Sequence, residues 1–482
     1  MKVCLINPTS TRKNWGHSFP PLGVAYLAAV ALDLGHEAFI IDRDLLLDEN
    51  GGNLSKVDRL MEELIRREKP AIVVLSVTTP LIPDAYKCAV LAKTIDPRIK
   101  TVIGGVHATV LPEQTMAECP AIDLLVVGEG EAVFADIISG RESGEILGLA
   151  YRADEEIVIN PSRPVIVDLD TIKMPARHLL RMDEYTKKSK YLIRGVSLRG
   201  TSIFTSRGCP YACSFCAGPL VFGRGVRFHS VDRVIAEIEQ IVERYKVEGI
   251  YFADDMFSAK RDRALEICER LISSGLSKKI VFAVQLKVNA VDEVLLKKLK
   301  QAGCIQVEYG FESGSQRILE LMNKRSTVEQ NVRAAELTRS LGLRFLANII
   351  TGMPGETKED FMATIDFIKR IKPDVTGFYK LILLPGSQLY ERQQTSSGHI
   401  VSPQRWEQAL QDDLSVNLTA MKDEEYFALF KHYGRFISLN NARNYFVYNL
   451  KREPLGTLLE TSGLVFNKLV RTLTKKGHPD EE

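Results

Sequence analysis

Three cysteines, Cys209, Cys213 and Cys216, fall within eight residues with the spacing C-x3-C-x2-C, directly after the strand-like run 202–205. Thiolates are the ligands that iron–sulfur clusters prefer, and a four-iron cluster ordinarily takes four of them. Three thiolates on one short loop can each bind one iron of a 4Fe–4S cubane and leave the fourth iron open to another ligand. The same trio could instead hold zinc with a distant fourth ligand, or remain as free thiols.

The elements that must position this loop follow it in the chain, where strand and helix patterns alternate. Strands are expected at 202–206, 249–253, 280–285, 305–310, 344–351 and 375–384. Helices are expected near 231–246, 260–274, 291–302, 315–322, 327–341 and 357–371. Capping-box spacings at Thr327…Gln330 and Thr357…Asp360 mark two of the helix starts. Repeated parallel βα units predict an incomplete barrel with its chemistry at the carboxyl ends of the strands.

The cysteine loop, with Phe215 just before its last cysteine, resembles the signature of the radical S-adenosylmethionine (SAM) superfamily. The resemblance implies that the open iron chelates SAM and that one electron cleaves the sulfonium to a 5′-deoxyadenosyl radical. It also implies SAM contacts at the strand ends, at Phe215, Asp254, Asp255, Gln285, Glu312, Ser313, Gly352 and Pro354. Lys287 could face the same mouth as Gln285. In isolation, a pair such as Asp254-Asp255 is more often a metal site or a helix cap, and Phe215 could simply be buried.

The N-terminal third alternates short apolar strands with helices. Strands are expected at 3–7, 38–42, 72–77, 101–105 and 124–128, with helices at 23–34, 57–67 and 84–95. This order predicts a doubly wound parallel sheet, which binds ligands beyond the carboxyl ends of its strands. Polar residues and glycines gather at those ends: Thr9, Ser76, Thr78, Gly104, Gly105, His107, Gly128, Glu129 and Gly130. A G-x-G-x-x-G fingerprint is missing, which weakens a nicotinamide interpretation.

This third is similar to the cobalamin-binding domain that precedes many radical SAM cores, through Pro20-Pro21-Leu22-Gly23 and the glycine-rich segments 104–109 and 128–131. The resemblance implies that those strand-end residues contact cobalamin. The D-x-H-x-x-G motif that supplies a lower histidine ligand in other cobalamin proteins is absent. His107 could approach a corrin, although a loop histidine that bonds to backbone or to the ligand's periphery is favoured. A sheet that keeps the fold without binding cobalamin remains the alternative.

We therefore expect an α/β chain divided into a cobalamin-binding-like domain (1–140), a linker (141–195), a radical SAM core (196–395) and a helical C-terminal region (396–482). In that last region helices are expected at 424–439, 442–448 and 455–473. Its many aromatic residues are explained most simply as a cap packed over the barrel. The alternative is an apolar wall for a tetrapyrrole or a lipid.

The composition is that of a globular protein, with 482 residues, 45% of them hydrophobic, and a net charge of +2. That balance predicts no nucleic-acid partner. The other five cysteines are scattered, which favours buried small side chains in a reducing cytoplasm over a disulfide framework. The N-terminus reads as a strand rather than a signal peptide, and no apolar run reaches the roughly 18 residues of a membrane span. Membrane contact is expected to be peripheral at most.

The activity that the resemblance implies is a cobalamin-dependent radical SAM methyltransferase. It would methylate an unactivated carbon of a small molecule, such as a tetrapyrrole, a lipid or another secondary metabolite, through the 5′-deoxyadenosyl radical and methylcobalamin. A reductant such as flavodoxin or ferredoxin would supply the electrons. An oxidative cyclase or other rearranging enzyme with the same cofactors is the nearest alternative. A methylthiotransferase is disfavoured because no second cysteine trio is evident, and a non-enzymatic cobalamin or redox sensor is the alternative from another class.

Overall fold

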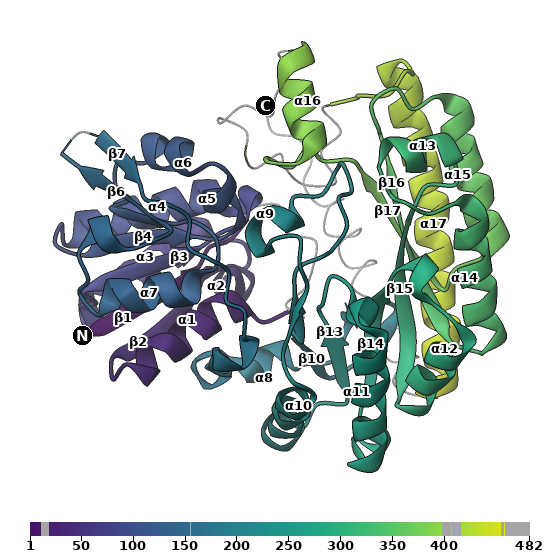
Figure 1. Ribbon diagram of the computed structural model, residues 1–482, viewed down its shortest axis with the longest axis horizontal. Coiled ribbons are helices and arrows are strands. Elements are labelled where there is room, and N and C mark those ends of the chain that lie inside the picture. Colours follow the sequence, from purple (N-terminus) through teal and green to yellow (C-terminus); the bar gives the residue numbers. More distant parts are fainter. Residues whose placement is uncertain (11–18, 155, 398–405, 407–415, 455–456, 458–482) are drawn as a thin grey trace, which may run out of the picture.

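A computed structural model describes residues 1–10, 19–154, 156–397, 406, 416–454 and 457 of the chain. Two α/β units lie side by side, the first drawn in purple and blue and the second in teal and green (Figure 1). The predicted α/β fold class is confirmed.

The first unit is built on a sheet with the strand order β2-β1-β3-β4-β5-β6-β7. Its strands are β1 (Lys2–Asn7), β2 (Glu37–Asp42), β3 (Ile72–Ser76), β4 (Lys100–Gly104), β5 (Leu124–Val126), β6 (Leu149–Ala153) and β7 (Glu156–Ile159). Strands β1 to β5 are parallel, as expected of a doubly wound sheet. The near-continuous apolar runs of β1, β3, β4 and β5 are buried, whereas the edge strand β2 is only partly buried. The last two strands are antiparallel.

Helices cover both faces of this sheet. One apolar layer packs α1 (Leu22–Asp33) and α7 (Gly130–Ile138) on the sheet. The layer on the other face takes residues from the remaining helices, which are α3 (Leu54–Glu68), α4 (Ile82–Ile95), α5 (Val106–Val110) and α6 (Pro112–Glu118). The short α2 (Arg43–Glu49) starts directly after β2.

The second unit is a six-stranded, all-parallel sheet whose strands follow in chain order. They are β10 (Gly200–Ile203), β13 (Gly249–Phe252), β14 (Val281–Leu286), β15 (Cys304–Glu312), β16 (Arg344–Thr351) and β17 (Val375–Lys380). The two end strands β10 and β17 do not pair with each other, so the barrel is incomplete, as predicted.

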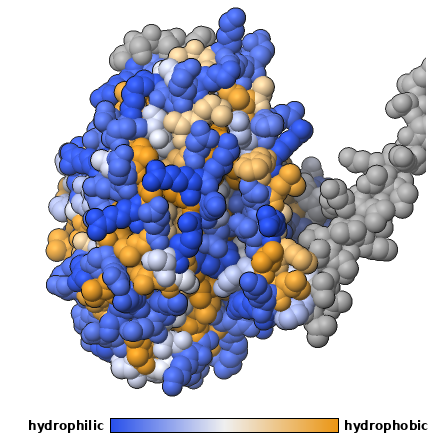
Figure 2. Space-filling model, turned by 90° about the vertical axis from the view of Figure 1, so that its right-hand side faces the viewer, coloured by the Kyte–Doolittle hydropathy of each residue, from blue (hydrophilic) through white to orange (hydrophobic). Residues whose placement is uncertain are grey.

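The outer helices of the barrel are α10 (Val231–Tyr245), α11 (Arg261–Ser273), α12 (Glu293–Gln301), α13 (Gln316–Leu321), α14 (Val328–Ser340) and α15 (Lys358–Ile371). Both predicted capping boxes form, at Thr327 with Gln330 and at Thr357 with Asp360. Each box satisfies N–H groups that a helix start leaves without partners. Figure 2 shows a flank that is mostly hydrophilic with apolar residues interspersed.

Shorter elements connect these layers. Two antiparallel ribbons, β8 (Ser189–Ile193) with β9 (Val196–Leu198) and β11 (Ser206–Arg207) with β12 (Arg227–Phe228), flank the start of the barrel. The remaining helices are α8 (Met182–Tyr185), α9 (Gly218–Phe222), α16 (Gln388–Ser397) and α17 (Asp423–Arg452).

Helix α17 runs along the open edge of β17, where asparagine side chains bind backbone. Asn441 accepts from the N–H of Thr376 (2.9 Å) and donates to the carbonyl of the same residue (2.8 Å). Asn449 does the same for the β8–β9 ribbon, accepting from Ser197 N (3.0 Å) and donating to Gly195 O (3.1 Å). These amides satisfy backbone groups that an edge strand would otherwise leave open.

The structure departs from the sequence-based expectations in two places. Residues 149–153 and 156–159, expected in the linker, form β6 and β7 and extend the first sheet. The break expected between helices 424–439 and 442–448 is wrong, because α17 continues through Asn440 and Asn441. Asparagine is a weak helix former, but here its side chain gains partners on β17. The predicted helix 455–473 lies outside the described residues except for residue 457. In the described part of the chain, no helix is long and apolar enough to cross a membrane.

Candidate active site

The cysteine loop spans 208–226 and is framed by the β11–β12 ribbon, in which Arg207 faces Arg227. Gly208 opens the loop with φ of +95°, and a Cβ there would lie 2.2 Å from the carbonyl oxygen of Gly225. Only glycine fits so close an approach at a positive φ. The middle of the loop is anchored at the C-terminal end of α13, since Ser214 donates through its N–H to the carbonyl of Met322, the residue after that helix (2.9 Å).

The three cysteines are free thiols, with Cys209 and Cys213 half-buried and Cys216 exposed. Within the described residues, no three His, Cys, Asp or Glu side chains are grouped as ligands of a single metal ion. A cubane makes a different demand, because each thiolate binds a different iron. Burial raises the pKa of Cys209 and Cys216, and the neighbouring Cys213 adds to both shifts, so these thiolates need cationic compensation. The donor set therefore fits an iron–sulfur cluster better than one zinc ion.

Two lysines supply positive charge beside the cysteines. The ammonium of Lys287 lies 3.0 Å from the centroid of the Tyr211 ring and has no hydrogen-bond partner among the described residues. Burial lowers the pKa of Lys287 to about 8, against the opposing influence of Cys213. Lys324 pairs with Glu312 at 2.6 Å. Both cations can stabilise anionic sulfur ligands.

The predicted SAM pair Asp254 and Asp255 is divided between two roles by the structure. Asp254 is buried, accepts from the N–H groups of Thr205 (2.6 Å) and Ser206 (2.9 Å), and also accepts from Thr205 Oγ1 (2.5 Å). Its carboxylate thus fastens the chain just before the cysteine loop. Asp255 is exposed and lines the cavity described below. Of the two, Asp255 is the one placed to meet a ligand.

The other predicted strand-end residues also differ in placement. Gln285 donates to the hydroxyl of Tyr251 (2.8 Å), which donates to Glu308 (3.1 Å), so Gln285 belongs to a polar network in the barrel. Ser313 is buried and shares a hydrogen bond with Thr364 Oγ1 (2.9 Å). Glu312 adopts φ of +64° at the end of β15, where the pairing register shifts. Such strain in a non-glycine residue is typical of functional sites.

The turn that contains Gly352 and Pro354 is held together by hydrogen bonds to the side chain of Glu356. Gly352, with φ of +95°, and Met353 both donate their N–H groups to Glu356 Oε2, at 2.6 and 2.9 Å. Phe215 packs on the apolar cluster that contains Met353. The turn therefore lies against the cysteine loop through Phe215.

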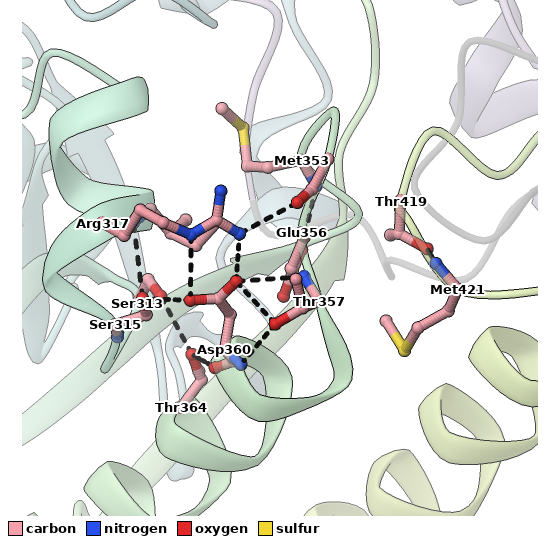
Figure 3. A network of polar contacts seen from close by, with 12 residues as sticks. Ser313, Ser315, Arg317, Met353, Glu356, Thr357, Asp360, Thr364, Thr419 and Met421 are labelled. Carbon is pink, nitrogen blue, oxygen red and sulfur yellow. Dashed lines mark hydrogen bonds and ion pairs between the residues drawn. The ribbon is translucent and has the colours of Figure 1, made fainter.

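A polar network below this turn joins two helix starts (Figure 3). Asp360 accepts from Ser315 Oγ (2.6 Å) and from Thr357 (3.0 Å) and pairs with Arg317. Arg317 also donates to the carbonyl of Gly355 (2.9 Å). These contacts hold the end of β15 and the end of β16 in a fixed position relative to each other.

A first prediction concerns Glu356, whose pKa burial raises from 4.5 to about 7, although two backbone N–H groups oppose the shift. Between these two pH values the folded protein keeps a proton that the unfolded chain has released. The free energy of unfolding therefore falls as the pH rises through this window. Glu356→Gln keeps the acceptor and removes the charge, so the apo variant should be more stable than wild type by up to about 3 kcal/mol above pH 7 and equally stable below pH 4.5.

Urea unfolding across this pH range checks the prediction for Glu356, with the exposed Glu359→Gln as control. A parallel pH profile in Glu356→Gln would contradict it.

A cavity of about 390 Å³ lies between the two units. One wall comes from the carboxyl ends of β3, β4 and β5 and from α1 and α7, and the other from the start of the barrel. Residues of the barrel side are Phe204, Ser206, Arg207, Val221, Phe222, Ala253 and Asp255. The cavity thus joins the glycine-rich strand ends to the cysteine loop.

Seven of the nine predicted cobalamin residues line this cavity: Ser76, Thr78, Gly104, Gly105, Gly128, Glu129 and Gly130. Thr9 does not, because its N–H donates to Asp84 (2.9 Å) and its hydroxyl to Asp44 (2.8 Å). The cavity is lined both by glycine backbone and by the apolar side chains of Val74, Val102 and Phe134, which suits a large, flat ligand with apolar faces. The residues present therefore fit the flat ring of a corrin.

His107 also lies outside the cavity lining. It is fully buried, its Nδ1 shares a hydrogen bond with Thr79 Oγ1 (3.2 Å), and its ring meets Trp406 edge to face at 4.7 Å. Burial lowers the pKa of His107 to about 4, which keeps the ring neutral. None of the described residues that line the cavity is a histidine. This placement favours a structural role over cobalt ligation.

A second prediction concerns Gly105, where φ is +111° and a Cβ would lie 2.4 Å from the carbonyl oxygen of Val77. Gly105→Ala should destabilise the apo protein by about 2–4 kcal/mol because both the φ value and the clash oppose a side chain. Gly104→Ala is the matched control, since its Cβ would meet Val126 at an ordinary 3.4 Å. It should cost less than about 1 kcal/mol. Thermal unfolding of both variants checks the difference, and equal losses would contradict it.

Several cavity residues carry no signal in the sequence. Tyr26 and Phe222 lie within 6 Å of the Arg207 guanidinium, at 5.7 and 5.8 Å from their ring centroids. The sequence predicts no role for Arg207, yet it pairs with Glu129 and Glu131 of the other unit. The sequence offered one indication of this role: Arg207 is a charged residue next to the cysteine motif and has no acidic neighbour in the chain.

The fold and site together define a two-domain α/β protein in which a doubly wound sheet faces the mouth of an open barrel that carries a cluster loop. Comparison with known proteins agrees with this class. The radical SAM superfamily matches residues 203–368, and the B12 binding domain matches residues 11–138.

Similar proteins were found both by sequence and by structure. The chain is 37% identical to the uncharacterized methyltransferase PH0819 of Pyrococcus horikoshii, over 81% of this chain and 83% of that protein. It is 32% identical to the anaerobic magnesium-protoporphyrin IX monomethyl ester cyclase of Rubrivivax gelatinosus, over 81% and 70%. The radical SAM methyltransferase TsrM of Kitasatospora setae, solved with cobalamin and a 4Fe–4S cluster, shares the fold with a TM-score of 0.66 at 21% identity, over 83% and 76%.

The chain belongs to the radical SAM superfamily, among the members that carry an N-terminal B12-binding domain. Membership implies a 4Fe–4S cluster, SAM and cobalamin as its cofactors, and the residues described above fit all three.

Proposed function

We propose that this protein is a cobalamin-dependent radical SAM methyltransferase that acts on an unactivated carbon of a small molecule. The observation that carries the proposal is the shared cavity, in which glycines of the first unit face Asp255 and the base of the cysteine loop. The cluster with SAM supplies a hydrogen-abstracting radical, and cobalamin supplies the methyl group. The protein's own part is to bind these groups, orient them and exclude water.

The cluster would be held by Cys209, Cys213 and Cys216. For SAM we propose Asp255, Phe215, Glu312, Gly352 and Pro354 as contacts, supported by their placement around the cysteine loop. Asp255 is an exposed carboxylate suited to an ammonium group, and Lys287 is a buried cation suited to a carboxylate. Asp254, Gln285 and Ser313 are then supports that fix the strand ends, because each is bonded to protein.

For cobalamin we propose contacts from Ser76, Thr78, Gly104, Gly105, Gly128, Glu129 and Gly130. Glycines in this set let backbone approach a bulky ligand. Thr9 and His107 would not contact cobalamin; they would support the ends of the strands through their hydrogen bonds to other protein groups.

The substrate would enter the space between the two units. Phe204, Val221 and Phe222 give the barrel side of the cavity an apolar wall, which favours a substrate with an apolar part, such as a tetrapyrrole or a lipid. A reductant such as flavodoxin or ferredoxin would deliver electrons. Because all eight cysteines are free thiols, we propose a reducing compartment, the cytoplasm.

We also propose the division into residues 1–140, 141–195, 196–395 and 396–482 as working domain limits. Strands β6 and β7 tie the beginning of the linker to the first domain. Helix α17 ties the C-terminal region to the barrel.

A second candidate is an oxidative cyclase with the same cofactors, favoured by the 32% identity to a protein of that name. Product mass separates the two. Protein reconstituted without oxygen is incubated with SAM, cobalamin, reductant and candidate substrates, and the products are examined by mass spectrometry. A gain of one CH2 unit, labelled when methyl-labelled SAM is supplied, supports methylation. Ring formation without that gain rejects it, and failure to cleave SAM with any substrate rejects both enzymes in favour of a sensor.

A further inference from the structure

The two strands that frame the cysteine loop are joined by one carboxylate from the other unit. Glu129 Oε1 pairs with Arg207 of β11 at 2.8 Å, and its Oε2 pairs with Arg227 of β12 at 2.7 Å. These arginines face each other in the ribbon, so Glu129 closes the base of the loop. Because Gly128 and Gly130 flank it, the same segment presents backbone to the cavity and its side chain to the loop.

Further contacts fix the geometry of this group of charged side chains. Glu131 pairs with Arg207 at 2.5 Å, and Arg227 also donates to the carbonyls of Ile166 (2.6 Å) and Phe222 (3.0 Å). Two carboxylates and two guanidiniums balance in charge, and the side chain of Glu129 is only 4% exposed. Burial alone would raise the pKa of Glu129, but hydrogen bonds from Arg227 and Arg207 outweigh it, so the carboxylate stays ionised.

The position of these ion pairs connects ligand binding in the cavity with binding of the iron–sulfur cluster by the cysteine loop. Glu129, Glu131 and Arg207 all line the cavity, and Arg207 is two residues from Cys209. A ligand that orders segment 128–131 would also restrain the two arginines, since separating these ion pairs would leave buried charges without partners. The same holds when the cysteine loop is ordered by its metal cluster.

We propose that Glu129 is a positioning residue that couples occupation of the cavity by cobalamin to order in the cysteine loop. Each cofactor then strengthens the binding of the other, because a coupling between two sites is reciprocal. The inference rests on the proposed occupation of this cavity by cobalamin. It assigns to Glu129 a task beyond contact with the corrin.

The test compares cobalamin affinity in two forms of the full chain, the apo protein and the cluster-loaded protein, by anaerobic absorbance titration with hydroxocobalamin. In wild type, the dissociation constant should be about 10-fold lower in the cluster-loaded form. In Glu129→Gln, which keeps the size of the side chain and removes its charge, the two values should agree within about 2-fold. The reciprocal measurement follows the loss of the cluster's visible absorbance to an iron chelator. Cobalamin should slow this loss in wild type and not in Glu129→Gln.

The matched control is Glu49→Gln, which removes an ion pair with Arg181 (2.6 Å) outside the cavity and should keep the wild-type ratio. If Glu129→Gln does not fold by circular dichroism, Arg227→Lys replaces it, because a lysine cannot reach Glu129 and both carbonyls together. Wild-type binding with equal affinities in the two forms overturns the inference alone, as does a wild-type ratio in Glu129→Gln. Absence of any cobalamin binding overturns the proposed cofactor and the inference together.

Discussion

Replacing Cys213 by serine is expected to remove the cluster and, with it, cleavage of SAM. The loop supplies three thiolates, and two cannot hold a cubane that already has one open iron. Iron content should fall from about four atoms per chain to less than about one, and the rate of 5′-deoxyadenosine formation should fall by more than about 1,000-fold.

Iron and sulfide analysis of protein reconstituted without oxygen, with chromatographic assay of 5′-deoxyadenosine, measures both effects. Cys268→Ala is the control, since Cys268 is fully buried in the barrel core and is not part of the cysteine loop. It should retain the iron. A Cys213→Ser protein that keeps four irons and cleaves SAM would contradict the assignment of the loop.

Replacing Asp254 by alanine is expected to destabilise the protein by about 3–5 kcal/mol. Two backbone N–H groups and the Thr205 hydroxyl would lose their acceptor in a buried site. Arg263, which donates to Thr205 O at 2.9 Å, would also lose its nearby negative charge. Urea unfolding of the apo protein measures the loss.

The adjacent Asp255→Asn is the matched comparison and should leave stability within about 0.5 kcal/mol, because none of the described residues forms a hydrogen bond or an ion pair with this exposed carboxylate. It should instead weaken SAM binding by about 10- to 100-fold, the value of one charged hydrogen bond. Equilibrium binding to the cluster-loaded protein tests this. If Asp255→Asn unfolds the protein and Asp254→Ala impairs only SAM binding, the two roles are reversed.

The sequence predicted the fold well because its signals are local. Apolar runs bounded by glycine marked the parallel strands, and the boxes at Thr327 and Thr357 marked helix starts that form as expected. Strands β6 and β7 lie in a stretch that was expected to be a linker, and nothing local in the sequence indicates which sheet such short strands join.

The site was harder to predict, because neighbouring residues on a chain can face opposite surroundings. Asp254 and Asp255 have the same side chain, yet one fastens the backbone and the other lines the cavity. The pairing of Glu129 with Arg207 spans 78 positions in the sequence and depends on how two domains meet. Such contacts follow from tertiary packing and not from spacing.

The asparagines of α17 have a consequence for the width of the barrel. The Asn441 side-chain amide bonds to both the N–H and the carbonyl of Thr376 on the outer edge of β17, so this position of the edge cannot pair with a further strand or with another chain. Helix α17 thereby helps to keep the sheet an open half-barrel, in which β10 and β17 remain separate edges.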